Sequence, residues 1–379
     1  MFSKVVQKVM LTALVAVSSL VGLGSVSFAQ KTTAPPKTYP DKKYHVQLIA
    51  KIADGKTDAV IKTLTEKVAA TPDDVESWYV LSMAYCRTGD IPHAVEAMRR
   101  AIAQGLPAER FVAGPRDWFA PLYETAAYQA MVQELKSPII HGPMVGNVTD
   151  RAASFWIRTV EEEPFYVIVG KDPELKAPLR TPGGFTHAER DYTGIARIES
   201  LEPDTTYYYD IVIDGKRIFS ENPPQFRTFP AEGRPAKFEI AFGGGAGYNP
   251  QYERMWDTIR GHRPIAFLFL GDNVYIDQPE VPQAQRYCYY RRQTRPEYRR
   301  FTASTSIFAI WDDHDFCTND RWGGPNRNDP PWKIPVWKLF QENWVNPAYG
   351  GGEKHPGCWF TFRIADVQFI MLDGRYWRT

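Results

Sequence analysis

Residues 306–315 read SIFAIWDDHD, a short apolar run that ends in four titratable residues. Residues 265–275, IAFLFLGDNVY, have the same arrangement, with Gly271 and Asp272 directly after the apolar run. A third apolar segment, residues 238–242, leads into three glycines. Short apolar runs bounded by turn residues are typical of buried strands, and strands alternating with helices predict an α/β sheet with parallel strands. Ligands of such sheets bind beyond the carboxyl ends of the strands, where these acids lie.

The acids at these strand ends predict a metal site. Asp272, Asp312 and Asp313 would repel one another at one sheet edge unless a cation neutralised them. Carboxylate oxygens suit hard cations such as Ca²⁺, Mg²⁺, Mn²⁺ or ferric iron, and a pair of such cations can clamp a phosphate and activate water. His314 within the cluster is placed to protonate a leaving oxygen. The alternative is that these acids are only solvated caps at the strand ends.

Helical periodicity dominates the chain from residue 44 to residue 136. Gly55 and Gly89 are 34 positions apart, and Pro72 and Pro107 are 35 apart. This period, with small and large residues alternating on paired helices, resembles a tetratricopeptide repeat, whose stacked helices could bind a protein partner. The alternative is a plain helical segment that packs on the next domain.

From residue 137 to residue 230 the apolar period changes to 2, which predicts strands. Residues 201–209 follow the pattern Leu-x-Pro-x-Thr-x-Tyr-x-Tyr, similar to the tyrosine corner of fibronectin-III-like β-sandwiches. We therefore expect a β-sandwich over 137–230 and, after a hinge, the α/β region over 236–379.

The first 43 residues have the features of an export signal and a linker. Residues 1–29 combine two lysines, an apolar run of about 15 residues and a small-residue cleavage site at Ala29, which predicts a signal peptide. Residues 30–43 are rich in Pro, Lys and Thr and are expected to form a linker. The protein is thus expected to be exported to the periplasm or the extracellular space, with no membrane span after cleavage. A balance of 45 Lys and Arg against 44 Asp and Glu gives no signal for nucleic-acid binding.

Four segments in order resemble a known family. They are residues 242–246 (FGGGA), 271–275 (GDNVY), 311–320 (WDDHDFCTND) and 372–378 (LDGRYWR). Together they resemble the PhoD-type alkaline phosphatase/phosphodiesterase family of calcineurin-like metallophosphoesterases, and the resemblance covers about residues 137–379. It implies an exported hydrolase that cleaves phosphoric esters with a metal-activated water, and an immunoglobulin-like domain ahead of the catalytic domain.

The resemblance also implies roles for single residues. Asp272 corresponds to the carboxylate that bridges two metals, and Tyr290 to a phenolate ligand that favours ferric iron, with Tyr289 as a near-equal candidate. The second metal would fall to Asp312, Asp313 and Asn319. His314 corresponds to the histidine that faces the phosphate, and Arg375 to a residue that orients the phosphate or its loop. The metals would be divalent or trivalent ions, with Ca, Fe, Mn and Mg all possible.

Two departures from the family pattern favour a second hypothesis. Gly245 stands where the family often has a cysteine ligand. The family also continues past the segment around Asp373 to a Gly-Asp-x-His segment, so we expect a partial catalytic domain here. The alternative function is therefore a non-catalytic binding or scaffold protein that carries a degenerate phosphatase domain. Because every candidate ligand follows residue 271, we also expect the helical region to be dispensable for the chemistry.

Overall fold

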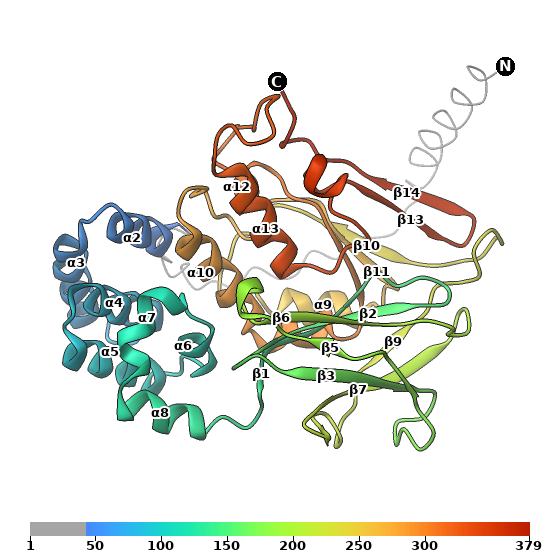
Figure 1. Ribbon diagram of the computed structural model, residues 1–379, viewed down its shortest axis with the longest axis horizontal. Coiled ribbons are helices and arrows are strands. Elements are labelled where there is room, and N and C mark those ends of the chain that lie inside the picture. Colours follow the sequence, from blue (N-terminus) through green and yellow to red (C-terminus); the bar gives the residue numbers. More distant parts are fainter. Residues whose placement is uncertain (1–42) are drawn as a thin grey trace, which may run out of the picture. The chain divides into compact units, whose positions relative to one another are not determined.

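The computed structural model describes residues 43–379 (Figure 1). The predicted signal peptide, residues 1–29, and all but the last residue of the predicted linker lie outside the described residues. Within the described part, no helix combines the length and the apolar character needed to cross a bilayer.

The predicted helical region is present. Its helices are α2 (Tyr44–Ala53), α3 (Thr57–Ala70), α4 (Val75–Thr88), α5 (Ile91–Ala103), α6 (Glu109–Ala113), α7 (Arg116–Tyr123) and α8 (Ala126–Gln133). The Asp74 side chain accepts the amide proton of Ser77 at the start of α4, and Gly89 ends that helix in the left-handed conformation. Helix α4 then packs against α5 and α3. The tetratricopeptide-like character of these helices stays a prediction.

Two sheets form the β region that follows. Its strands are β1 (Ile139–Gly146), β2 (Ala153–Thr159), β3 (Pro164–Gly170), β4 (Leu179–Arg180), β5 (Gly184–Phe185), β6 (Thr193–Ile198), β7 (Thr206–Ile213), β8 (Lys216–Arg217) and β9 (Gln225–Arg227). Strands β1, β2 and β6 pair in one sheet, whereas β3 and β7 form the centre of the other. Phe155 of the first sheet packs against Tyr209 and Phe226 of the second. The likeness to fibronectin III stays a prediction.

The C-terminal region has the predicted alternation of strands and helices. Its elements are β10 (Ile240–Gly243), α9 (Met255–Gly261), β11 (Ala266–Phe269), α10 (Pro282–Gln293), α11 (Pro296–Thr302), β12 (Ser306–Ala309), α12 (Asp313–Phe316), α13 (Lys333–Asn343), β13 (Phe360–Ile364) and β14 (Val367–Met371). Strands β10, β11 and β12 are parallel, as expected, and β13 and β14 form a hairpin.

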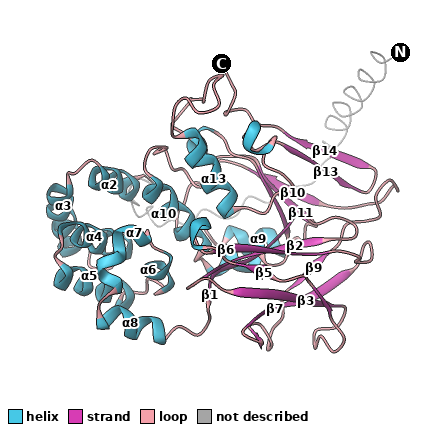
Figure 2. Cartoon of the chain, viewed as in Figure 1, coloured by secondary structure: helices cyan, strands magenta, loops and turns pink. Residues whose placement is uncertain are grey.

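One sheet crosses the predicted boundary between the sandwich and the α/β region. Its order is β10-β11-β12-β1-β2-β6, and β1 joins β12 in parallel through Gly146 and Ile307 (Figure 2). The antiparallel strands of the sandwich therefore continue the parallel strands that carry the acidic residues. The sequence pattern alone predicts two separate domains for these strands, because the pairing of β1 with β12 joins residues that lie far apart in the chain.

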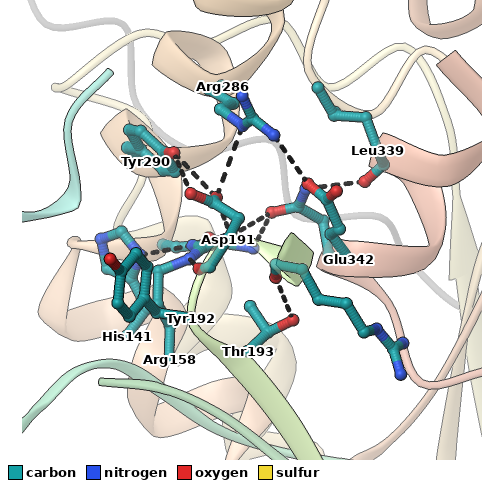
Figure 3. A network of polar contacts seen from close by, with 12 residues as sticks. His141, Arg158, Asp191, Tyr192, Thr193, Arg286, Tyr290, Leu339 and Glu342 are labelled. Atoms are coloured by element: carbon teal, nitrogen blue, oxygen red, sulfur yellow. Dashed lines mark hydrogen bonds and ion pairs between the residues drawn. The ribbon is translucent and has the colours of Figure 1, made fainter. Parts of the chain in front are cut away.

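A buried polar network ties the sandwich to helices α10 and α13 (Figure 3). The Arg158 guanidinium of β2 pairs with Asp191 at 2.9 Å, and it donates to Gln293 of α10 at 2.6 Å. It also donates to Nδ1 of His141 at 2.7 Å, so neutral His141 carries its proton on Nε2 and donates to Thr294 at 2.9 Å. Every member contacts a partner from a different part of the chain, which fixes the sheet against α10.

This network predicts acid sensitivity. Burial, reinforced by the Arg158 charge, lowers the pKa of His141 well below its ordinary value. In acid, His141 therefore becomes protonated in the unfolded chain but stays neutral in the folded chain. The free energy of unfolding consequently decreases as the pH falls below about 6.5, the ordinary pKa of histidine. We expect His141 to contribute a loss of up to about 2 kcal/mol in the free energy of unfolding between pH 7.5 and pH 5.

Denaturant unfolding of the wild type, His141→Gln and His262→Gln at both pH values measures this loss. His262 is exposed, so its variant should keep the wild-type pH dependence, whereas His141→Gln should flatten it. Equal pH dependence in all three proteins would contradict the assignment.

Candidate metal centre

The register of the parallel strands sets the candidate site. Phe269 at the end of β11 pairs with Ala309 at the end of β12. Asp272 lies three residues after Phe269, and Asp312 lies three residues after Ala309, so the two acids are at equivalent positions beyond the strand ends. The two loops approach closely at Gly271, where a Cβ would lie 2.5 Å from the Cβ of Asp312. Gly271 also has φ +103°, so only glycine suits this position. The sheet edge therefore brings the two acidic loops together.

A buried carboxylate joins these loops. Asp315 accepts the backbone amides of Asn273 at 2.9 Å and Val274 at 3.0 Å, and it also forms a capping box with Asp312 at the start of α12. Burial raises the pKa of Asp315 to about 7, against the opposing effect of these amides. Asp315 thus organises the loops from a position that is only 4% exposed.

Three side chains converge where the loops meet. Asp272, Asp313 and His314 each offer one ligand atom, and these atoms lie within 4.8 Å of one another. Oδ1 of Asp272 is buried and has no hydrogen-bond partner among the residues described. Burial and the neighbouring Asp313 charge raise the pKa of Asp272, although His314 opposes this shift. A buried carboxylate oxygen without a donor, beside a second carboxylate and an imidazole, fits a hard divalent or trivalent cation.

The loop that carries Asp272 has an unusual backbone. Asp272, Tyr275 and Asp277 have φ values of 52°, 55° and 55°, although none is glycine. Left-handed conformations of such residues cost free energy and persist where the surrounding structure holds them, which is common at functional sites. Here the amides bound by Asp315 supply that restraint.

Tyr275 is a residue of the site that was not predicted from the sequence. Its hydroxyl is hydrogen-bonded to Asp272, and burial together with the Asp272 charge raises the pKa of Tyr275 to about 12. Its ring lies 4.6 Å from the His314 ring, and a Cβ at Gly245 would lie 3.6 Å from its hydroxyl. Tyr275 therefore lies beside the group of Asp272, Asp313 and His314, with its hydroxyl close to Gly245. The signal was present in the GDNVY segment, where Tyr275 follows Asp272 by three residues.

The assignment of Tyr290 to the metal is corrected. Its hydroxyl lies in the buried network of Figure 3 and donates to the Asp191 carboxylate at 2.7 Å. Tyr289, the alternative, accepts a hydrogen bond from Trp344 at 3.2 Å in the apolar core. Neither tyrosine joins Asp272, because helix α10 turns both hydroxyls toward other elements.

Asn319 and Asp312 also lie outside the group of three. The exposed Asn319 side chain donates to Asp320 at 2.8 Å. Asp312 is 42% exposed and pairs with the Arg375 guanidinium. Arg375 lies 3.4 Å from Asp313 as well, so it borders the site as a counter-charge. Burial acts to raise the pKa of Asp313, but the hydrogen bond from the Asp320 amide and the charge of Arg375 outweigh burial, and the pKa is lowered.

Arg375 is positioned by Asp373. The Asp373 carboxylate accepts the amides of Arg375 and Tyr376, at 2.8 Å and 2.9 Å, and the indole N–H of Trp311 at 3.0 Å. Trp311 directly precedes Asp312, so one carboxylate fixes the C-terminal loop against the strand end that bears the acids.

Comparisons with known proteins support the fold. Residues 136–231 match DUF7800, a domain family of unknown function, over nearly the range predicted for the sandwich. No curated protein matches the sequence. The solved structure of PhoD is similar with a TM-score of 0.54 and 15% identity, covering 65% of this chain and 54% of PhoD. The chain thus spans about half the length of PhoD, and at this identity the likeness concerns the fold alone.

A second solved structure is more distant. The purple acid phosphatase PPD1 from yellow lupin (Lupinus luteus) seeds has a TM-score of 0.44 and 13% identity, covering 62% of this chain and 46% of the phosphatase. We draw no argument from a similarity of this size.

A pair of tyrosine variants tests the corrected assignment. Tyr275→Phe removes the hydroxyl beside Asp272 and should weaken Mn²⁺ binding by roughly tenfold, because groups that orient a ligand affect metal affinity on this scale. Tyr290→Phe should leave Mn²⁺ binding unchanged, but it should cost about 1–3 kcal/mol of stability by removing one of the hydrogen bonds that the buried Asp191 carboxylate accepts. Isothermal titration and denaturant unfolding of both variants measure these effects. Weaker Mn²⁺ binding in Tyr290→Phe alone would restore the original assignment.

Proposed function

We propose that the protein is an exported metal-dependent hydrolase of phosphoric esters, of the alkaline phosphatase/phosphodiesterase type. The observation that carries the proposal is the convergence of Asp272, Asp313 and His314 at the carboxyl ends of β11 and β12, with one buried Asp272 oxygen left without a donor. The PhoD-like fold is consistent with this chemistry.

Asp272 and Asp313 would hold the cation, and the Tyr275 hydroxyl would orient the Asp272 carboxylate through its hydrogen bond. A bound cation of this kind would lower the pKa of a coordinated water and neutralise charge on the phosphoryl oxygens. Mn²⁺, Ca²⁺, Mg²⁺ and ferric iron all suit these oxygen donors.

The remaining groups of the site would orient the ester and supply a proton. His314 carries a proton on Nδ1, which Asp277 accepts at 2.5 Å, so its Nε2 is the nitrogen left to serve the site. Protonated at Nε2, it would donate to the leaving oxygen. Arg375 offers guanidinium donors next to Asp313 that would hold a phosphoryl oxygen in place.

The alternative, a non-catalytic binding protein, predicts a different outcome. It would bind inorganic phosphate or a metal without turning over any ester. Gly245, which stands where the resembled family often has a cysteine ligand, is the residue that favours it, whereas the convergence of Asp272, Asp313 and His314 favours hydrolysis. We therefore keep it as an outcome of the test below.

Removing one carboxylate of the site tests the proposal. Asp313→Asn should lower the turnover of aryl phosphate and bis-aryl phosphate by at least about a hundredfold and should reduce the bound metal, because an amide is a weaker ligand than a carboxylate. Asp366→Asn, at an exposed position between β13 and β14, is the matched control and should retain wild-type turnover.

The assays follow removal of metal with a chelator and addition of Mn²⁺, Ca²⁺, Mg²⁺ or Fe³⁺ in turn. A wild-type protein that binds one of these ions but hydrolyses neither ester would favour the binding hypothesis. Full activity in Asp313→Asn would contradict the placement of the site.

A further inference from the structure

A line of three charged or polar side chains runs from the helical region to the candidate metal site. The Lys43 ammonium lies 2.8 Å from Oδ2 of Asp277, and Oδ1 of Asp277 lies 2.5 Å from Nδ1 of His314. The side chains of Asp277 and His314 are 11% and 12% exposed, and that of Lys43 is 26% exposed. His314 in turn belongs to the group with Asp272 and Asp313.

Asp277 determines which nitrogen of His314 faces the site. An ionised carboxylate only accepts hydrogen bonds, so the proton of neutral His314 lies on Nδ1 and the lone pair on Nε2. The backbone reinforces this placement, because the amides of Ile276 and Asp277 donate to the His314 carbonyl at 2.8 Å and 3.1 Å. The ring and its backbone are therefore both held by the loop after β11.

Asp277 needs a counter-charge to stay in this place. It is a third, largely buried carboxylate close to a group that already contains Asp272 and Asp313. Like charges in a partly buried setting repel, and a buried carboxylate without a neighbouring cation tends to rotate toward water. The Lys43 ammonium supplies this positive charge, because it lies next to Oδ2 of Asp277 whereas His314 binds Oδ1.

Packing of the helical region holds Lys43 in place. Lys43 directly precedes α2, and its carbonyl accepts the Gln47 amide at 2.9 Å. Helix α2 packs on α10, where the His45 ring lies 6.5 Å from that of Tyr287. The Arg110 guanidinium of α6 lies 5.4 Å from the same Tyr287 ring, so a second helix of the region contacts α10.

The helical region and the α/β region also share one apolar core. Tyr79 and Phe119 belong to the same buried cluster as Trp256 and Trp344. Residue 43 is thus tied to the loop around Asp277 by a continuous set of buried contacts and not by one surface ion pair, which by itself would be worth little.

We propose that Lys43 is a positioning residue of the metal site, which acts through Asp277 to hold His314 with Nε2 toward Asp272 and Asp313. The inference rests on the proposed function and gives the helical region a part in it. It replaces the expectation that this region is dispensable for the chemistry.

Three full-length variants test the proposal. Lys43→Met removes the charge and keeps much of the side-chain length, and Lys43→Arg keeps the charge. Lys56→Met removes an exposed lysine of the same helical region, which pairs with the exposed Asp54. Melting curves of all three provide the folding control.

The first readout does not depend on activity. In protein labelled with ¹⁵N-histidine and loaded with Mg²⁺, the Nδ1–H resonance of His314 is assigned by its loss in His314→Asn. We expect this resonance in the wild type, Lys43→Arg and Lys56→Met, and we expect it to broaden or disappear in Lys43→Met.

The second readout is turnover of aryl phosphate with Mg²⁺ or Mn²⁺. Lys43→Met should lower kcat by roughly three- to tenfold, with KM within twofold of the wild type. We expect this small loss because Lys43 acts through Asp277, whereas groups that contact and orient a metal ligand directly typically change activity by about 10- to 100-fold. Lys43→Arg should restore kcat to within twofold of the wild type, and Lys56→Met should not change it.

Two outcomes would overturn the proposal: a wild-type resonance and kcat in Lys43→Met, or a Lys43→Arg protein that is as impaired as Lys43→Met. If the wild type hydrolyses no ester, the proposed function fails, and the histidine resonance alone then decides whether Lys43 positions His314.

Discussion

The close approach of two loops at Gly271 is the constraint on which the candidate site depends. A side chain there would clash with Asp312, so the glycine lets the loops after β11 and β12 meet. The Asp315 carboxylate then fixes them by binding two amides of the opposite loop. This contact brings Asp272 to Asp313 and His314 despite the repulsion between the two carboxylates, and burial, with the Asp313 charge as a smaller cause, raises the pKa of Asp272. A bound cation would offset both the burial of the charge and the repulsion.

The elements around the α/β region restrain this arrangement from two sides. On one side, the buried network of Arg158 and Asp191 holds the β-sandwich against α10 (Figure 3). On the other, helices α2 and α6 pack on Tyr287 of the same helix. Helix α10 is therefore the common support of the three regions. The regions that the sequence divides into domains are therefore joined here, because β1 also pairs with β12 and adds the strands of the sandwich to the parallel sheet.

The sequence predicts the strands and the acidic loops well because both depend on local patterns. A buried run followed by Gly-Asp or by consecutive acids needs no knowledge of distant residues, and Asp272, Asp313 and His314 do come together. Tyr290 was misplaced because its surroundings depend on what packs on α10. Its partner Asp191 is 99 residues away in the sequence, and no local pattern encodes that contact.

The contact between β1 and β12 and the pairing of Lys43 with Asp277 were unpredictable for the same reason. Tyr275 is a different case. It follows Asp272 by three residues in the GDNVY segment, so the sequence held the signal, although the motif alone does not say what the tyrosine contacts.

The most direct test of this account is to locate the metal. Crystals of the full-length protein soaked in Mn²⁺ and measured at the manganese absorption edge would show each bound ion as an anomalous difference peak. We expect a peak at roughly 2.0–2.6 Å from Oδ1 of Asp272, with Asp313 as a second ligand. A protein that binds Mn²⁺ with its peak elsewhere, and with the Asp272 oxygen still free of any ligand, would contradict it.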